Sequence, residues 1–310
     1  VLLLKYDSDG NLLWSKVWGG QEPEFVGSMT SDLSGNVYIC GYTASFGYTF
    51  GPSFIVKYDP TGKLLWNKVY MGYIGSIAFS ADNAIYAAGE VWVSPESGHA
   101  ALHKLDSDGS LIWSVDWGAF EQSTASSMAL CSSGDVFVVG YTRIPAFQGS
   151  GFLLRLDATG SLICAKEWEQ CTPRSVFAGP WGCILVTGEV WKPGLGGRVG
   201  FVLKYDPDGG PLLSKGWIAQ STLVEGRAMA VDNMRNVYLA GYSYQGALGS
   251  WRDIEWEQSA LAGQVSPSGI GVETVAGTES VPEGIETSPE GVIDTGAGLG
   301  EVMLLKNFPR

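Results

Sequence analysis

The sequence is poor in positive charge. Nineteen Lys and Arg residues stand against thirty-two Asp and Glu residues, so the formal net charge is −13. Such a chain repels phosphate backbones and anionic lipid headgroups, and we predict that it has no nucleic-acid partner. Long apolar runs are also missing, since none approaches the roughly 18 residues that a membrane-spanning helix needs. We therefore predict no transmembrane segment.

Residues typical of active sites are scarce as well. The two histidines, His99 and His103, have no Cys or acidic residue beside them at the spacing of a zinc site or a catalytic triad, and we interpret them as one surface and one strand histidine. The glycine-rich stretch GLGGRVG at 194–200 is not followed by a helical pattern, so it does not indicate a phosphate cradle. Acidic pairs such as Glu22 with Glu24 are expected by chance among thirty-two acids. The sequence thus predicts no catalytic residues, no metal site and no cofactor.

Cysteine is present in an odd number, with five residues at positions 40, 131, 164, 171 and 183. An odd number leaves at least one thiol unpaired in a secreted protein. Cys40 and Cys131 occupy apolar strand positions and are expected to pack as small hydrophobic residues. Cys164, Cys171 and Cys183 lie close together in the chain, so one disulfide among them remains an open alternative.

Glycine and aromatic residues are abundant, with 43 Gly, 12 Trp, 13 Tyr and 12 Phe, and they recur in a fixed pattern. The segment LLLKYDSDGNLLWSKVW at 2–18 returns at 54–70, 101–117, 152–168 and 201–217. A second segment, SMTSDLSGNVYICGYT from residue 28, returns from residues 76, 127, 175 and 228. The basic residue of the first segment recurs every 47 to 52 residues, and a period of that length indicates a repeat architecture.

Each period reads as four short strands. Apolar residues occupy alternate places in NVYICGY at 36–42, and no stretch of similar length keeps a helical spacing. Turns of the type Asp-Ser-Asp-Gly at 7–10 separate the strands, and they are typical of hairpins. A four-stranded antiparallel unit repeated about every 50 residues is typical of a β-propeller blade. We predict an all-β chain with almost no helix.

The same Asp-rich turns could hold calcium, because Asp7 and Asp9 have the spacing of the first ligands of a calcium loop. Asp9 is replaced by Thr61 and Thr159 in sister copies. We therefore favour a turn that the first Asp caps, with calcium binding as the alternative.

The last part of the chain keeps the phase of the repeat but not its composition. Residues 1–248 form regular repeats, whereas 249–310 are divergent and acidic, with nine acidic residues and one basic residue between 251 and 300. The chain starts in the middle of a repeat. We predict a single β-propeller domain over 1–310 and expect it to be a fragment of a longer chain.

The repeat K-Y-D-x-x-G-x-L-L-W-S-K-x-W-G-G, followed by S-I-A-x-D-x-x-G-N-V-Y-x-x-G-Y-T, resembles the SBBP-type β-propeller repeats, relatives of the NHL repeat. The resemblance implies an extracellular or cell-surface protein. It also implies a blade order in which the SMTSD-type strand is innermost, followed by NVYICGY, LLLKYD and NLLWSKVW. Counted this way, the chain favours seven blades, with six as the alternative.

Two sets of aromatic residues recur on the outermost strand of each blade: Trp18, Tyr70, Trp117, Trp168 and Trp217, and Trp14, Trp66 and Trp113, with Cys164 in the fourth copy. A Trp buries about 200 Å², so these residues favour packing between sheets over a stacking platform for a ligand. A glycine also recurs on the second strand, as Gly41, Gly89, Gly140, Gly188 and Gly241. It indicates a close approach of two backbones.

Loops that differ in length and composition follow the second strand of each blade, and they contain many aromatic residues. Variation at one edge of a repeat array is where recognition evolves. We predict a ligand-binding face on these loops, with Phe46, Tyr48, Trp92, Phe147, Trp191, Tyr244 and Trp251 as its residues. The alternative is that these aromatics only close the ends of the blades.

The sequence favours a noncatalytic interaction or structural module, whose partner is a protein, a glycan or a second copy of the chain. The alternative is an enzyme on the same scaffold, such as a glycosidase, a lyase or a quinoprotein, because a fold does not fix function. The expected inner strands offer mostly apolar residues such as Met29, Ile77 and Met128. That composition speaks against an active site at the propeller axis.

Overall fold

The computed structural model describes residues 1–45, 52–94, 97–117, 122–143, 149–179, 182–193, 197–206, 209–219, 224–243 and 249–253. Over these residues the chain forms strands and turns without an α-helix, and therefore has no helix long and apolar enough to cross a bilayer. The chain divides into two compact units, whose described parts are residues 1–116 and 117–253.

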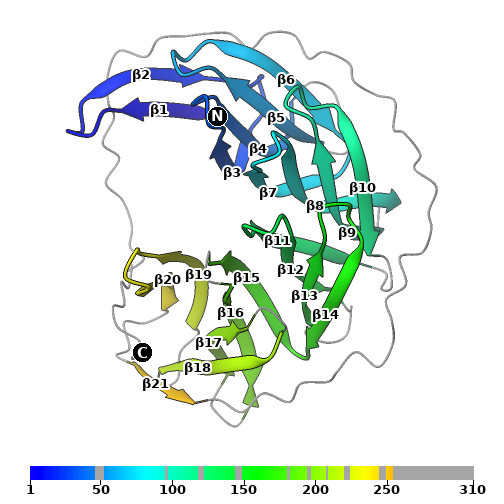
Figure 1. The fold of residues 1–310 in the computed structure, drawn as a ribbon, viewed down its shortest axis with the longest axis vertical. Helices are drawn as coiled ribbons and strands as arrows, with labels where there is room; N and C mark the ends of the chain where they lie inside the picture. The colour runs from blue at the N-terminus through cyan, green and yellow to red at the C-terminus, as the bar shows by residue number, and fades with distance from the viewer. Residues whose placement is uncertain are drawn as a thin grey trace. The chain divides into compact units, whose positions relative to one another are not determined.

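The first unit contains, in its described part, one strand pair and two four-stranded antiparallel sheets (Figure 1). The pair consists of β1 (Leu2–Tyr6) and β2 (Leu12–Val17). The first sheet has the order β3 (Glu24–Ser31), β4 (Val37–Thr43), β5 (Ser53–Tyr58) and β6 (Leu64–Tyr70). The second has the order β7 (Tyr73–Phe79), β8 (Ile85–Ser94), β9 (Ser97–Leu105) and β10 (Leu111–Trp117). Strand β7 packs against β3 and β4, so successive sheets contact each other through their first strands.

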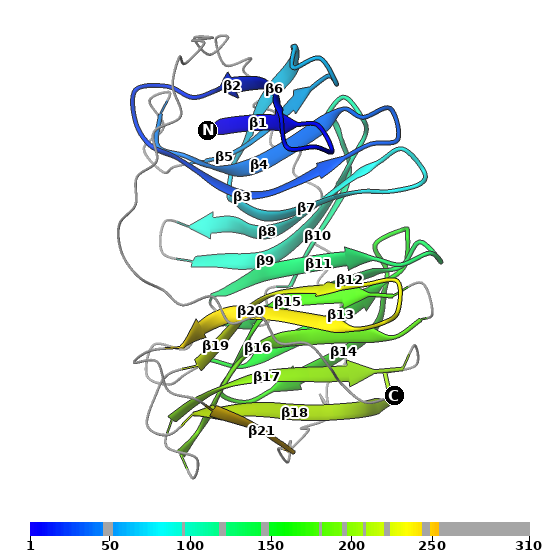
Figure 2. The same cartoon turned by 90° about the vertical axis from the view of Figure 1, so that its left-hand side faces the viewer.

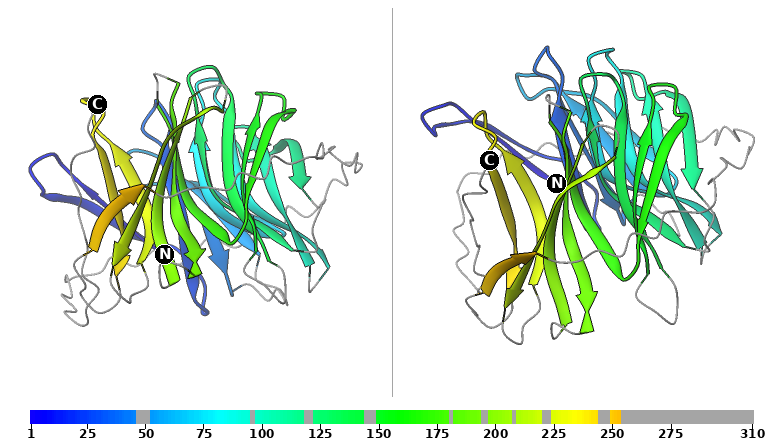
Figure 3. Two further views of the ribbon diagram at one scale, coloured as in Figure 1. Left: turned by 90° about the horizontal axis from the view of Figure 1, so that it is seen from below. Right: turned by 60° about the horizontal axis from the view of Figure 1, so that its bottom comes forward.

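The second unit repeats this arrangement. One sheet has the order β11 (Ser123–Leu130), β12 (Val136–Thr142), β13 (Gly151–Leu156) and β14 (Leu162–Trp168). The next has the order β15 (Cys171–Ala178), β16 (Ile184–Lys192), β17 (Gly197–Tyr205) and β18 (Pro211–Ala219), and its four twisted strands run side by side in Figure 3. The pair β19 (Val224–Val231) and β20 (Val237–Ser243) follows, with β19 packed against β15, β16 and β17.

The predicted fold class is confirmed. The chain is all-β and consists of repeated four-stranded antiparallel sheets, the blades of a β-propeller, and the strand order within each sheet is the expected one. The choice between seven and six blades stays a prediction, because residues 254–310 lie outside the described part of the chain.

One strand was not expected. Strand β21 (Gly249–Asp253) pairs with the outer edge of β18 and extends that sheet to five strands (Figure 2). The sequence predicts that these residues, Trp251 among them, belong to a loop of the ligand-binding face. They carry a Ser-Trp-Arg-Asp run that can alternate across a strand, and the open edge of β18 supplies the hydrogen-bond partners.

The recurring aromatic residues pack between sheets, as predicted. In the first unit, Lys5 Nζ and Trp14 Nε1 both donate hydrogen bonds to the carbonyl of Pro60, at 2.8 Å and 3.3 Å. Lys57 and Trp66 make the same two bonds to the carbonyl of Ser107, one sheet further on. These two repeats therefore each hold the hairpin turn of the next repeat through one cation and one indole.

The Asp-rich turns are capped by their first residue. Asp7 Oδ1 accepts hydrogen bonds from the backbone N–H groups of Asp9 and Asn11, at 2.9 Å and 2.8 Å. The same pair of bonds forms at Asp32, Asp59, Asp106, Asp157 and Asp232. The carboxylate thus satisfies backbone donors that the tight turn leaves unpaired.

All five cysteines are free thiols. Cys40 and Cys171 are buried, and burial raises the pKa of both thiols, to about 12 at Cys40. The open alternative of a disulfide among Cys164, Cys171 and Cys183 is therefore not what the structure contains.

Candidate functional site

A β-bulge in the first strand of each sheet directs one side chain out of the hydrogen-bonded ladder. At each bulge the register skips one residue opposite the recurring glycine of the second strand. A Cβ on Gly188, for example, would lie 2.2 Å from the carbonyl oxygen of Thr172, which confirms the predicted close approach of two backbones. The skipped residues are Gly27, Gly75, Ser126, Arg174 and Arg227. Because bulges re-aim side chains and are common beside functional sites, the two arginines are the first candidates for a site.

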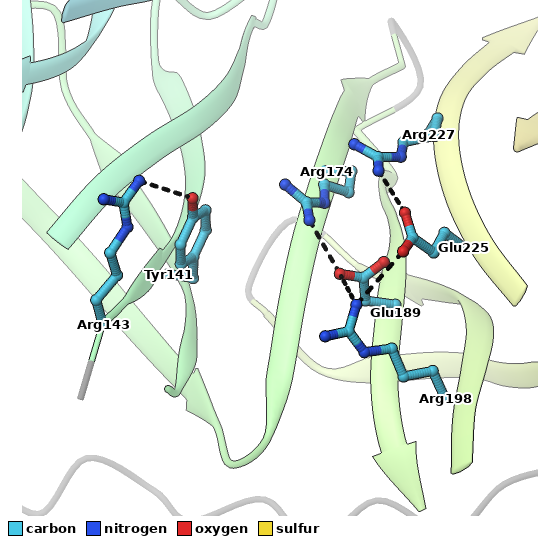
Figure 4. A network of polar contacts seen from close by, with 7 residues as sticks. All are labelled: Tyr141, Arg143, Arg174, Glu189, Arg198, Glu225 and Arg227. Atoms are coloured by element: carbon cyan, nitrogen blue, oxygen red, sulfur yellow. Dashed lines mark hydrogen bonds and ion pairs between the residues drawn. The ribbon is translucent and has the colours of Figure 1, made fainter. Parts of the chain in front are cut away.

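Arg174 and Arg227 belong to a continuous chain of charged contacts in the second unit (Figure 4). Arg174 Nη2 donates a hydrogen bond to Glu189 Oε1 at 2.9 Å. Arg198 Nη1 lies 3.6 Å from Glu189 Oε1 and 3.4 Å from Glu225 Oε1, and so bridges the two carboxylates. Arg227 Nη2 donates to Glu225 Oε2. We call these five residues, which come from β15, β16, β17 and β19, the Arg–Glu cluster.

Tyrosine rings lie against the cluster. The guanidinium of Arg174 lies 5.7 Å from the centroid of the Tyr141 ring, and that of Arg227 lies 5.0 Å from the Tyr242 ring. Arg143 also contacts Tyr141, with Nη2 donating to the phenol oxygen at 3.4 Å (Figure 4). These are distances at which a cation is attracted to a ring face, so the rings help to fix the guanidinium groups.

The positions of these residues follow from the repeat. Tyr141, Glu189 and Tyr242 each come directly after the recurring glycine of a second strand. A close approach between β19 and β16 then brings in Glu225: a Cβ on Gly226 would lie 2.3 Å from Thr187 Oγ1. Packing between neighbouring sheets, and not spacing along the chain, completes the cluster.

The two carboxylates are buried and the guanidinium groups reach solvent. The side chains of Glu189 and Glu225 are 5% and 8% exposed, whereas the three arginine side chains are between 25% and 42% exposed. Burial raises the pKa of Glu189, and the charge of Glu225 raises it further, while Arg174 and Arg198 oppose the rise. Glu189 Oε2 and Arg174 Nε are both buried without a hydrogen-bond partner among the described residues. Buried polar atoms are usually satisfied, so these two atoms are exceptions in an otherwise paired network.

The cluster carries a positive charge, unlike the chain as a whole. Four of the eight arginines, Arg143, Arg174, Arg198 and Arg227, gather in this network, although the whole chain carries −13. Three arginines against two glutamates give the cluster itself a formal charge of +1. The cluster is therefore a local excess of positive charge on an otherwise acidic protein.

The predicted aromatic residues fall into three groups. Phe46, Tyr48, Phe147 and Tyr244 lie outside the described residues, and Trp251 lies on strand β21. Trp92 and Trp191 lie on extensions of β8 and β16, and not on loops as the sequence suggested. Both belong to the same four-residue sequence, Gly-Glu-Val-Trp, after the second strand's glycine.

Of these residues, the structure brings Trp191 next to the Arg–Glu cluster. Trp191 pairs directly with Arg198 across β16 and β17, and it lies two residues after Glu189, so all three share one face of the sheet. Its side chain is exposed, at 37%. Its counterpart Trp92 pairs with Gly98 instead. There the carboxylate of Glu90 lies over Gly98, in the place that Arg198 takes in the second unit.

The histidines are paired within one sheet. His99 Nδ1 lies 2.9 Å from Asp116 Oδ2, and His103 Nδ1 lies 2.8 Å from Ser114 Oγ. Both histidines lie on β9, and the side chain of His99 is only 16% exposed, so His99 is a second strand histidine and not the surface histidine that the sequence suggested. Burial lowers the pKa of His103 to about 4, which keeps its ring neutral.

The residues of the Arg–Glu cluster were not predicted, because the prediction relied on the alternating pattern of each strand. A bulge residue stands outside that alternation, and the partners of Arg174 come from other strands. Two signals were present: the repeated Gly-Glu-Val-Trp, and the absence of arginine before Arg143.

Comparison with known proteins finds only distant structural similarity. No family model and no curated protein matches the chain. Among solved structures it is similar to a protein of unknown function from Bacteroides caccae, with 10% identity and a TM-score of 0.48 over 78% of this chain and 83% of that one. It is also similar to the β-propeller domain of the Trilobed protease from Pyrococcus furiosus, with 10% identity and a TM-score of 0.41 over 76% and 83%. A Synechocystis apocarotenoid oxygenase matches with 12% identity and a TM-score of 0.40, over 75% of this chain and 65% of the oxygenase.

Proposed function

We propose that the protein is a noncatalytic, extracellular or cell-surface module of the SBBP type that recognises a partner through a negatively charged group. The observation that carries the proposal is the Arg–Glu cluster. Its guanidinium groups are partly exposed and hold more N–H donors than the two glutamates use. Guanidinium groups are the residues of choice for carboxylate and other oxyanion partners.

The location of the cluster supports recognition. Glu189 and Trp191 lie near the end of β16, and Arg198 lies near the start of β17, where the long connections between second and third strands begin. That is the edge at which the sequence predicts a protein, a glycan or a second copy of the chain to bind.

The proposal is tested with two variants that each remove one positive charge from the same unit. Arg227→Gln removes an arginine of the cluster, whereas Arg235→Asn removes an exposed arginine from a turn whose φ of 67° asparagine tolerates. Wild type and variants are compared for retention on dextran sulfate, poly-glutamate and polygalacturonate, with neutral dextran as the control matrix. We expect salt-sensitive retention on at least one anionic matrix, weakened by Arg227→Gln and unchanged by Arg235→Asn. Equal retention of both variants, or none for the folded wild type, would refute recognition by the cluster.

Localisation needs a separate measurement. Antibodies against the folded domain should label intact cells of the source organism or the medium around them. Label that appears only after the cells are permeabilised would exclude the proposed location.

A second function is favoured by one observation, the two neighbouring carboxylates of Glu189 and Glu225. Glycosidases use a carboxyl group of raised pKa together with an ionised one, and the pKa of Glu189 is raised by burial. An enzyme of this type would release reducing ends from a polysaccharide and lose activity in Glu189→Gln. Binding of a polysaccharide without release of reducing ends supports the noncatalytic proposal.

A further inference from the structure

We propose that the Arg–Glu cluster and Trp191 together form a binding site for a uronic acid unit of an acidic polysaccharide. The sugar carboxylate binds the guanidinium groups of Arg198 and Arg227, and the pyranose ring lies on the exposed face of Trp191. This inference rests on the proposed function, because it names the partner that the cluster recognises.

The free donors of the cluster fit a carboxylate. Arg198 contacts both glutamates through Nη1 alone, and its Nη2 and Nε make no hydrogen bond to the described part of the chain. Arg227 likewise uses only Nη2. A guanidinium presents its donors in a planar fork that matches the two oxygens of a carboxylate. The two arginines therefore hold unused donors on the exposed side of the cluster.

The charge of the site favours a single negative charge. The two buried glutamates cancel two of the three guanidinium charges, and one monoanion makes the site neutral. A dianion such as a phosphate monoester would leave an excess negative charge beside Glu189 and Glu225, which are already buried. Since the charges are only partly solvated, that excess is unfavourable.

The exposed indole of Trp191 favours a sugar over an acidic peptide. Residues that lie directly opposite on neighbouring strands have Cβ atoms about 5 Å apart, and Trp191 is opposite Arg198. The indole and the guanidinium therefore branch from adjacent positions on one face of the sheet. Trp191 is 37% exposed, so part of its side chain is open to solvent on the face of the sheet that carries Arg198. The ring carbons of a pyranose present a flat C–H face of the size of an indole.

The first unit supplies a natural control. Trp92 occupies the same position of the repeat as Trp191, but Gly98 stands opposite it where Arg198 stands in the second unit. A protein that bound sugars by aromatic contact alone would use both tryptophans. Recognition of a uronic acid requires an arginine beside the ring as well, so it would use only Trp191.

The test uses tetragalacturonate as the probe, with its methyl ester and a neutral galactose tetramer as matched ligands, and isothermal titration as the readout. We expect the wild type to bind tetragalacturonate and neither neutral ligand. Arg198→Lys keeps the charge that holds the two glutamates and loses the planar fork, and Trp191→Ala removes the exposed ring; each should weaken binding about tenfold or more. Trp92→Ala and Arg235→Asn should bind as the wild type does, and thermal unfolding should show that all four variants are folded.

Three results would overturn the proposal: binding of the methyl ester as tightly as the acid, unchanged binding by Arg198→Lys or Trp191→Ala, or no binding by folded wild type. Penta-glutamate serves as the peptide probe. If it binds more tightly than tetragalacturonate and loses affinity in Arg198→Lys, the uronic acid assignment is wrong while the proposed recognition of a negatively charged partner stands. If neither probe binds and Arg227→Gln leaves retention on all anionic matrices unchanged, both proposals fail.

Discussion

Acid should destabilise the protein through His103, and the structure sets the size of the effect. Burial lowers the pKa of this histidine from its ordinary value of 6.5 to about 4, and the nearby Asp116 opposes the change only in part. The folded state thus binds fewer protons than the unfolded state between these two pH values. Stability from His103 is complete above pH 6.5 and is lost as the pH falls to about 4. At about 1.4 kcal/mol for each pH unit, the loss is about 3 kcal/mol.

The matched variant His103→Gln removes the titrating group and keeps a side chain that can hydrogen-bond to Ser114. Urea unfolding of both proteins between pH 8 and pH 4 isolates the effect, because the two proteins have all other ionisable groups in common. We expect the wild type to lose about 3 kcal/mol relative to the variant across this range, with the steepest change below pH 6.5. Parallel pH profiles for the two proteins would refute the assignment of a neutral His103.

Three further predictions follow from the described contacts. Gly188→Ala should destabilise the protein by about 1–3 kcal/mol, because its Cβ would lie 2.2 Å from the carbonyl oxygen of Thr172; a urea midpoint equal to wild type would contradict this. Asp59→Ala should lower the melting temperature more than Asp59→Asn, which keeps the acceptor that caps the turn, and equal losses would mean that the cap contributes little. Reductant should leave the intact mass unchanged, because all five thiols are free, and a thiol reagent should not modify Cys40 and Cys171 before unfolding. A gain in mass on reduction would reveal a disulfide.

The sequence was sufficient for the fold because the information is local and repeated. The capping Asp lies within the turn that it stabilises, and apolar and polar residues alternate within each strand. Several copies of the repeat show the same pattern. The packing role of Trp14 and Trp66 was also predictable, since a residue needed in every repeat is more often structural than functional.

The candidate site was not predictable in the same way. Arg174 and Arg227 stand at bulges, where the alternation that identifies buried and exposed positions is interrupted. Glu189 lies on the next strand of the same sheet as Arg174, and the contact between Arg198 and Glu225 joins β17 to β19 of the following pair, so the alternating pattern of a single strand does not reveal the cluster. Strand β21 was missed for a related reason: its partner in the described part of the chain is the edge of β18, 30 to 38 residues earlier.

The bulge gives the repeat one place where side-chain chemistry can change without cost to strand pairing. In the first unit a larger side chain is crowded at the bulge position. A Cβ on Gly27 would lie 3.0 Å from the backbone oxygen of Gly75, and one on Gly75 would lie 2.8 Å from the ring of Tyr73. In the second unit this position is open, and it holds Ser126, Arg174 and Arg227. A duplicated blade can therefore acquire a new specificity by a single substitution at this position. Substitution of Arg227 by other residues is a direct way to alter recognition while the scaffold stays unchanged.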